Sequence, residues 1–191
     1  EVAAAAHWHA ERLSTSRSQD GTYLLEASGA YDPVGMFSNA TQAALVEIDC
    51  GTGDVHVIDF IVVEDCGVLI NPMIVDGQVR GGITQGIASA LYEQLVYSPD
   101  GQPLSGSFMD YLVPTASEIP PIRIHHLQTA AEGSVTGAKG MGEGGAIGAP
   151  AAVLAAVNDA LAAFGAEIDE IPVTPEKVLA ARGAGVGAEQ R

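Results

Sequence analysis

Two runs of β-branched and apolar residues stand out in the pattern of hydrophobic and polar positions along the chain. They cover 41–49 and 55–65, and the five residues between them include two glycines. A linker of this length and composition favours a β-hairpin with a longer loop. The second run is apolar at odd and even positions alike, as at Val57 and Ile58, which predicts a strand covered on both faces. Further strands are expected at 22–31 and 122–129.

Helical spacing of apolar residues occurs in two later segments. Over 76–92 the apolar residues recur every three or four positions, and Asp76 can cap the start. Over 150–164 the proline at the start suits a first helical turn, and Gly165 suits the residue just past the end. This second segment is apolar nearly all round, which predicts a buried helix whose first turn holds Pro150.

The remaining elements complete the predicted fold. The sequence indicates a chain reversal at 98–101 and a last short helix that begins at 174–176. We expect an α+β fold of mixed, largely antiparallel sheet elements with packed helices. We also expect a frayed or linking segment over 1–20, the main domain (one or two subdomains) over 21–182, and a loose tail over 183–191.

Composition narrows the classes of protein. The chain has 191 residues with 24 acidic and 8 basic side chains, a net charge of −16, and 5% aromatic residues. This balance argues against nucleic acid and anionic membrane surfaces as partners. The longest apolar stretch, 148–164, carries Asn158 and Asp159 and falls short of a membrane span. Cys50 and Cys66 fit buried, reduced thiols in a cytoplasmic protein.

A glycine-rich loop is the strongest candidate for a functional site. Six glycines fall within 137–150, ahead of the apolar helix, and Lys139 and Glu143 are the only charged residues among them. Glycines let backbone N–H groups approach a ligand closely, and a helix N-terminus adds a partial positive charge. A carboxylate among such donors suits a proton acceptor. A linker or a tight packing turn would also explain the glycines.

Part of this loop formally matches a dinucleotide-binding motif. Residues 140–145 read G-x-G-x-x-G, and an acidic residue follows at Glu167 or Asp169. A nicotinamide-dinucleotide fold needs this motif directly after a strand, with the helix opening inside it. The last expected strand ends near 129 and Pro150 places the helix start later, so we rank this alternative low.

A second glycine-rich block spans 76–86. Its four glycines lie within a predicted helix, where each costs about 1 kcal/mol relative to alanine. That cost indicates close approach either by another helix or by a ligand. Gln78 and Gln85 can each donate and accept, as the edge of a pterin-like ring would require. Tight helix packing with solvated glutamines is the other interpretation.

The histidines and cysteines indicate no metal-binding site. His7 and His9 lie near the start, His56 begins a strand, and His125 and His126 point to opposite faces of another. No Cys/His spacing typical of a metal site is present, and Cys66 fits a core position better than a nucleophile.

The order of the motifs resembles the xanthine oxidase family of molybdenum hydroxylases. The matching blocks are EDCGVLINPMIVDGQVRGGITQGIASALYE, GSFMDYLVPTASEIPPI, GAKGMGEGGAIGAPAAVLAAVNDAL and PVTPEKVLAA, within about residues 22–181. The likeness is greatest to the bacterial branch with carbon monoxide dehydrogenase-like large subunits. It covers the C-terminal part of the molybdenum-binding subunit. The Gly144 that follows Glu143 differs from the serine usual in carbon monoxide dehydrogenases, which argues against CO as substrate.

This resemblance implies a reaction and a site. It implies hydroxylation of a carbon in an N-heterocycle or aldehyde with water-derived oxygen, with Glu143 as general base. The cofactor would be Mo-molybdopterin, in the cytosine dinucleotide form, held by Gln78, Lys139, Gly140, Met141, Gly142 and, as a weaker assignment, Gln85. No residue of the chain is implied as a metal ligand.

The resemblance also implies partners. These are the remainder of the molybdenum subunit (as another chain or a missing segment), an FAD subunit and a [2Fe-2S] subunit that take the electrons, and a dimer of this unit. The start at Glu1 rather than Met agrees with a missing upstream part. A non-catalytic assembly module that keeps the same fold is the alternative from a different class.

Overall fold

The computed structural model describes residues 29–30, 32 and 34–188, with side chains up to 183. The chain divides into two units, residues 1–34 and 35–191, and the architecture below is that of the second. Of the expected strand at 22–31, nearly all lies outside the described residues. His7 and His9 lie outside them as well.

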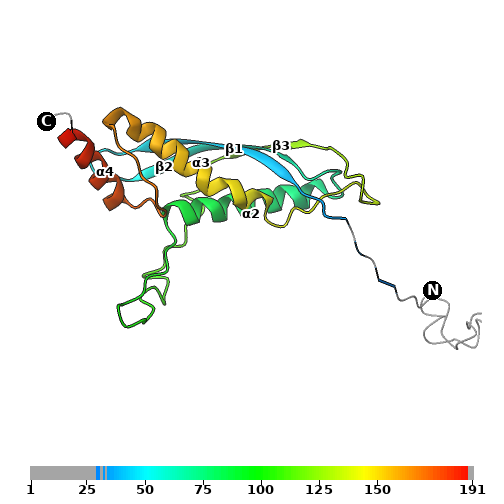
Figure 1. Ribbon diagram of the computed structural model, residues 1–191, viewed down its shortest axis with the longest axis horizontal. Helices are drawn as coiled ribbons and strands as arrows, with labels where there is room; N and C mark the ends of the chain where they lie inside the picture. Colours follow the sequence, from blue (N-terminus) through cyan, green and yellow to red (C-terminus); the bar gives the residue numbers. More distant parts are fainter. Residues whose placement is uncertain (1–28, 31, 33, 189–191) are drawn as a thin grey trace, which may run out of the picture. The chain divides into compact units, whose positions relative to one another are not determined.

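A three-stranded sheet in the order β1-β2-β3 forms one layer (Figure 1). The strands are β1 (Asn39–Ile48), β2 (Val55–Asp65) and β3 (Ile122–Leu127). The predicted hairpin is confirmed, because β1 and β2 pair antiparallel around a turn in which Gly53 takes a positive φ of 83°. β3 pairs with β2 in parallel, so β2, the following helix and β3 form a crossover unit that the sequence pattern did not indicate.

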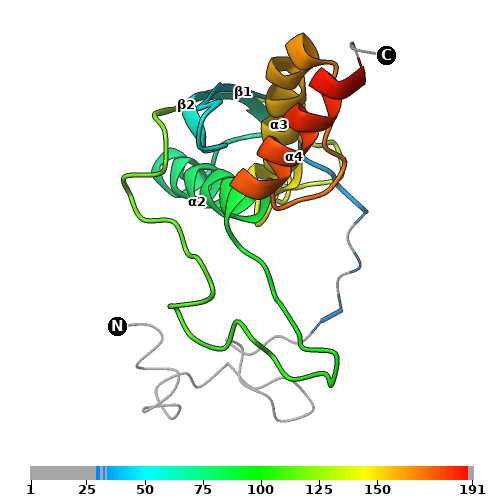
Figure 2. The same cartoon turned by 90° about the vertical axis from the view of Figure 1, so that its left-hand side faces the viewer.

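Two long helices, α2 (Pro72–Leu91) and α3 (Gly144–Leu161), pack against each other and against the sheet (Figure 2). Their buried faces meet β2 in one core, whose fully buried members include Phe60, Val62, Ile83, Val153 and Val157. The prediction that β2 is covered on both faces is wrong. Residues on its second face are more open, and Ile58 is 45% exposed.

The start of α2 differs from the prediction. Asn71 is the N-cap, its side chain accepts a hydrogen bond from the Ile74 N–H at 3.2 Å, and Pro72 occupies the first helical position. Asn-Pro supplies both the capping oxygen and the preset φ that a helix start needs. Asp76 therefore lies in the second turn rather than at the cap.

The start and burial of α3 are further corrections. The helix begins at Gly144 and takes Pro150 into its interior. Only one face is buried, at Gly145, Ala149, Val153, Val157 and Leu161, although alanines cover much of the rest. The segment 144–164 is long and apolar enough to cross a membrane by length and composition, a test that core helices of this kind also pass.

The C-terminal part agrees with the sequence pattern in its helix start. A short 3-10 helix, η2 (Ala162–Phe164), ends at Gly165 with φ 62°, as expected for a residue just past a helix end. Helix α4 (Pro175–Ala188) begins after Thr174, whose carbonyl accepts from the Val178 N–H. It continues into the region 183–191 that we expected to be a loose tail.

Between α2 and β3 an arm of residues 93–121 extends away from the sheet and helices (Figures 1 and 2, green). The predicted reversal at 98–101 is present, with the Ser98 N–H donating to the Gln102 carbonyl at 2.8 Å. Large apolar side chains on the arm face outward, and Phe108 and Met109 are 84% and 87% exposed.

Candidate functional site

The two glycine-rich blocks meet in the folded chain. The Gln78 side-chain amide, on the second turn of α2, donates to the Gly142 carbonyl at 3.0 Å. The two residues are 64 positions apart in sequence. The hydrogen bond fixes the loop that precedes α3 beside the N-terminal part of α2. Gln78, Met141, Gly142 and Glu143 are thereby brought together, as a shared site requires.

Helix packing explains one set of the glycines. A Cβ on Gly145 would lie 2.4 Å from the Val79 carbonyl oxygen, and one on Gly82 would lie 2.8 Å from the Ala146 backbone nitrogen. A Cβ on Gly86 would lie 2.5 Å from the Cβ of Ala149. Close approach of α2 and α3 therefore requires these glycines, which confirms the packing interpretation for half of the 76–86 block.

A second set of glycines has open space where a side chain would be. Nothing lies within 4 Å of a Cβ built on Gly77, Gly81, Gly140 or Gly142. Packing within the described part of the chain gives no reason for glycine here. The backbone at the start of α2 and along the loop is thus open to close approach by another group.

Glu143 lies at the N-cap position of α3, with φ −128° and ψ 10°. Its carbonyl accepts from the Ala146 N–H at 2.9 Å, while its side chain makes no capping hydrogen bond and is exposed. The carboxylate is therefore unengaged by its own helix. It lies where the helix dipole favours a negative charge.

Lys139 has a different environment from its neighbours in the loop. Its ammonium nitrogen lies 3.2 Å from the Asp65 Oδ1, and the two side chains are 11% and 6% exposed. Its backbone N–H donates to the Cys66 carbonyl at 2.7 Å. The lysine side chain thus anchors the loop to the end of β2, and its ammonium group is engaged within the fold. Gln85, seven residues beyond Gln78, is exposed about 10 Å farther along α2.

Asp65 is held by several polar contacts at the end of β2. Its side chain accepts from the backbone N–H groups of Gly67 (2.8 Å) and Thr129 (3.2 Å), in addition to the contact with Lys139. The hydrogen bond from Thr129, against the opposing effect of burial, lowers the pKa of Asp65 to about 2. The carboxylate is consequently a fixed negative charge beneath the loop.

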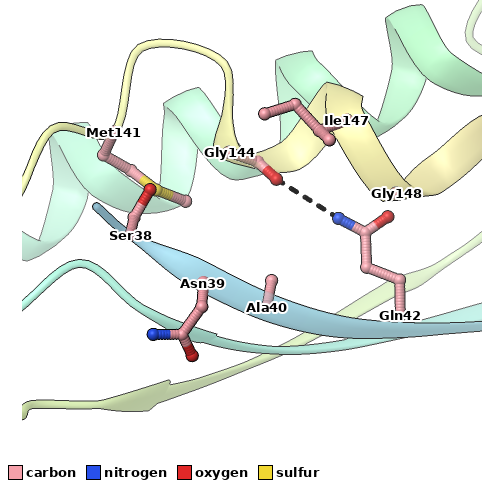
Figure 3. Close-up of a pocket in the computed structure, with 8 residues that line it drawn as sticks. All are labelled: Ser38, Asn39, Ala40, Gln42, Met141, Gly144, Ile147 and Gly148. Atoms are coloured by element: carbon pink, nitrogen blue, oxygen red, sulfur yellow. Dashed lines mark hydrogen bonds between the residues drawn. The ribbon is translucent and has the colours of Figure 1, made fainter.

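A small cavity of about 140 Å³ adjoins the loop on the side of β1 (Figure 3). Gln42 reaches from β1, and its side-chain amide donates to the carbonyls of Gly144 (3.3 Å) and Gly145 (3.1 Å). Sequence reasoning missed Gln42, which gives no signal because β1 also carries other polar residues, such as Thr41 and Glu47. The cavity is lined by Ser38, Asn39, Ala40, Gln42, Met141, Gly144, Ile147 and Gly148.

The cysteines divide between core and surface. Cys66 is buried, as expected, and burial raises the pKa of its thiol, with the nearby Glu64 carboxylate adding to the effect. A neutral buried thiol suits packing rather than nucleophilic attack. Cys50 is exposed, so the expectation that both thiols are buried is wrong for this residue.

The arrangement of the strands argues against the dinucleotide-binding alternative. Helix α3 does open inside the 140–145 motif, contrary to our prediction from Pro150. The motif, however, follows the end of β3 at Leu127 by more than ten residues, and among the described residues the sheet has a single parallel strand pair. A dinucleotide fold needs a strand that leads directly into the motif. The glycines of this loop must therefore serve another purpose.

Comparison with known proteins gives the family. Residues 1–120 match the model of the molybdopterin cofactor-binding domain. The nicotine 6-hydroxylase large subunit of Paenarthrobacter nicotinovorans is 47% identical over 95% of this chain and 22% of its own length. The carbon monoxide dehydrogenase large chain of Hydrogenophaga pseudoflava is 37% identical over 81% of this chain and 19% of its own.

Solved structures agree with these relatives. Quinoline 2-oxidoreductase from Pseudomonas putida 86 superposes with a TM-score of 0.82 and 45% identity, covering 94% of this chain and 22% of that one. The chain thus spans about a fifth of the length of these relatives. The chain belongs to the molybdopterin cofactor-binding domain family, within the large subunits of the xanthine oxidase family.

Proposed function

We propose that this chain holds part of Mo-molybdopterin in a molybdenum hydroxylase and supplies the general base, Glu143. The observation that carries the proposal is the hydrogen bond from Gln78 to the Gly142 carbonyl, 3.0 Å long. It joins the two glycine-rich blocks into one edge, with the exposed Glu143 carboxylate beside it.

The residues of this edge fit a flat, polar cofactor. Gln78 uses one N–H toward Gly142 and keeps a second N–H and its Oε1 for a ligand. The backbone at Gly140 and Gly142 is unshielded, so its N–H and C=O groups can be approached closely. Met141 and Gly142 would line the cofactor, Lys139 would contribute through its backbone, and Gln85 would contact only a more distant portion. When bound, Mo-molybdopterin supplies oxidation of a carbon with oxygen that originates from water.

Glu143 suits the acceptance of a proton during that reaction. Its side chain is exposed and is not used in capping α3. Its backbone is fixed by the Ala146 N–H and by the loop contact at Gly142. A base needs this combination of a positioned backbone and an available carboxylate. General bases of this kind contribute about a hundredfold to ten-thousandfold in rate.

We propose an N-heterocycle as the substrate class, with an aromatic aldehyde as the alternative. Two of the most similar relatives are named for nicotine and quinoline, both nitrogen heteroaromatic compounds. Gly144 after Glu143 offers less bulk than a side chain would, and a Cβ there would lie 2.5 Å from the Met141 sulfur. The cytosine dinucleotide form of the cofactor follows the bacterial branch that the sequence resembles.

The proposed enzyme works in the cytoplasm with further protein parts. These are the rest of the molybdenum subunit, a [2Fe-2S] subunit and an FAD subunit that receive the electrons, with two such units forming a dimer. The relatives support this because their names describe large or gamma subunits of complexes.

Replacement of Glu143 in the assembled enzyme tests the proposal. E143Q should lower kcat by about a hundredfold or more, because the amide cannot accept the proton, with molybdenum and pterin content unchanged. The matched control is E132Q, an exposed glutamate earlier in the same connection between β3 and α3, which should retain wild-type turnover. Wild-type turnover in E143Q would contradict the proposal. A wild-type enzyme with full molybdenum but no oxidation of any heterocycle or aldehyde would favour the non-catalytic assembly module.

A further inference from the structure

A cluster of two carboxylates and one histidine, running from the buried Glu64 to the half-exposed Asp76, lies beneath the second turn of α2. Glu64, near the end of β2, has a fully buried side chain whose Oε1 contacts the Nδ1 of His126 on β3. The other ring nitrogen, Nε2, lies 2.7 Å from the Asp76 Oδ1 on α2. Glu64 and His126 are direct partners in the parallel register. The imidazole therefore bridges the sheet and the helix.

The geometry determines the charge of the bridge. An imidazole can donate from both nitrogens only when it is protonated at both, as the imidazolium cation. A neutral ring would place a lone pair against one of the two carboxylates. The Glu64 Oε2 is buried and has no hydrogen-bond partner among the described residues. A buried carboxylate needs a nearby cation, because an unpaired charge away from water costs several kcal/mol.

We propose that His126 is a positioning residue for the cofactor-binding edge: as the imidazolium it clamps the second turn of α2 to the sheet, sets Gln78 against Gly142, and makes this edge sensitive to pH. Asp76 is two residues before Gln78, so a shift of the clamp is transmitted along the same helical turn. The proposal rests on the proposed function only in that it takes Gln78 as a cofactor ligand.

The two carboxylates at the end of β2 contact different parts of the cofactor-binding edge. Successive residues of a strand point to opposite faces. Glu64 is joined to α2 through His126, while Asp65 is joined to the glycine-rich loop through Lys139. One strand end thus holds both halves of the edge, and the two halves meet at the contact between Gln78 and Gly142.

The surroundings of His126 agree with a cation. The charged groups that face its ring are Glu64 from β2 and Asp76 from α2. The Cys66 thiol donates to the same Glu64 oxygen at 3.9 Å, and the Arg80 guanidinium is directed to the Ile122 carbonyl at 2.9 Å. Burial by itself lowers the pKa of His126, but the hydrogen bonds to Glu64 and Asp76 outweigh it and raise the pKa above its ordinary value.

The sign of the pH dependence follows from that direction. A histidine whose folded-state pKa is raised stabilises the fold fully at pH values below its unfolded pKa. The stabilisation is lost as the pH rises through the folded pKa. The clamp should therefore hold at pH values below the ordinary pKa of histidine and release as the pH rises through the raised pKa of His126, and the release should loosen the start of α2.

Hydrogen–deuterium exchange on the assembled enzyme tests the clamp directly. Wild type, H126Q and the matched control H125Q are compared at each pH, reading the peptide that covers 72–82. His125 is exposed on the neighbouring position of β3 and serves as the control for strand disturbance. H126Q should exchange about fivefold faster than wild type, the effect of losing one net hydrogen bond. H125Q should match wild type, and equal exchange in H126Q and H125Q would overturn the proposal.

A second variant keeps the test informative if H126Q fails to assemble. D76N retains an oxygen that can accept from Nε2 but removes a negative charge, so the pKa of His126 should fall and the loosening of 72–82 should begin at a lower pH than in wild type. An unchanged pH midpoint in D76N would overturn the proposal.

Cofactor content separates this proposal from the general function. Molybdenum and pterin retained after gel filtration should decline with rising pH in wild type, and should be low at every pH in H126Q. Retention in H126Q equal to that in H125Q would overturn the link between the clamp and the cofactor edge. By contrast, normal turnover in E143Q would overturn the proposed base and leave the clamp intact.

Discussion

The glycine-rich loop 137–143 and the arm 93–121 have little regular structure, yet they are held in opposite ways. The loop is tied to other elements, through Lys139 to Asp65 and through Gly142 to Gln78. The arm is tied mainly to itself, as between Val96 and Leu104. Long connections therefore differ by their anchors rather than by their helix or strand content.

Exposure shows the same contrast. Met141 of the loop packs against the hydrophobic core, whereas Phe108 and Met109 of the arm are 84% and 87% exposed. A loop with buried ties presents its backbone in one arrangement, as a binding site requires. An arm with outward apolar side chains presents a contact surface instead.

Loss of the loop's ion pair should have the largest effect. D65N leaves the Lys139 ammonium buried without its partner, which should destabilise the fold by about 3 kcal/mol. Denaturant unfolding of the purified protein measures this change. The matched control is E170Q, which breaks the exposed pair of Lys177 and Glu170 (3.4 Å) and should cost less than about 1 kcal/mol. Equal effects would mean that the buried pair does not anchor the loop.

Crowding between α2 and α3 should have the next largest effect. G145A brings a Cβ to within 2.4 Å of the Val79 carbonyl oxygen, and the overpacking should cost about 2 kcal/mol. G142A adds a Cβ in open space and should change stability by no more than about 0.5 kcal/mol. Thermal unfolding distinguishes the two, and a neutral G145A would contradict the close packing of the helices.

Acid should release the loop from the end of β2. The pKa of Asp65 is lowered to about 2, so its stabilisation is present above the unfolded value of about 4 and is lost as pH falls through the folded value. Exchange of peptides in 137–143 should therefore increase between about pH 4 and pH 2. D65N should show no such acid transition, and an unchanged transition in D65N would assign it to another group.

Loss of a single hydrogen bond within the arm, between Tyr111 and Glu93, should have the smallest effect. The Tyr111 hydroxyl donates to Glu93 Oε2 at 2.8 Å, and this bond raises the pKa of the tyrosine. Y111F should increase proteolytic cleavage within 93–121 while the global unfolding midpoint stays the same. Y97F, at a position 58% exposed, should leave cleavage unchanged. A lowered unfolding midpoint in Y111F would show that the arm is coupled to the core.

Sequence reasoning succeeded where the signal is local. The hairpin of β1 and β2, the helix start at Thr174 and the end at Gly165 follow from turn and cap chemistry. Sequence reasoning was wrong about the start of α3, where two local signals compete. Pro150 looked like a first-turn residue, but the small residues before it let α3 begin six positions earlier, at Gly144.

The sequence indicated which residues belong to the candidate site, but not which residues contact one another there. Gln78 and Glu143 are readable from their glycine-rich surroundings, and the resemblance to molybdenum hydroxylases assigns them roles. Gln42, Glu64 and His126 carry no motif, because their importance comes from burial and from partners far along the chain. Glu64 and His126, for example, are 62 positions apart and meet only through the parallel register of β2 and β3.

The sequence by itself determined the family, the two glycine-rich blocks and the principal elements, because these depend on local conformation and on residue type. The tertiary structure decided which glycines lie at the contact between α2 and α3 and which leave the backbone open. It also placed the Lys139 side chain in an ion pair with Asp65. It also placed His126 between two carboxylates. Such assignments depend on distances between segments that a pattern along the chain does not contain.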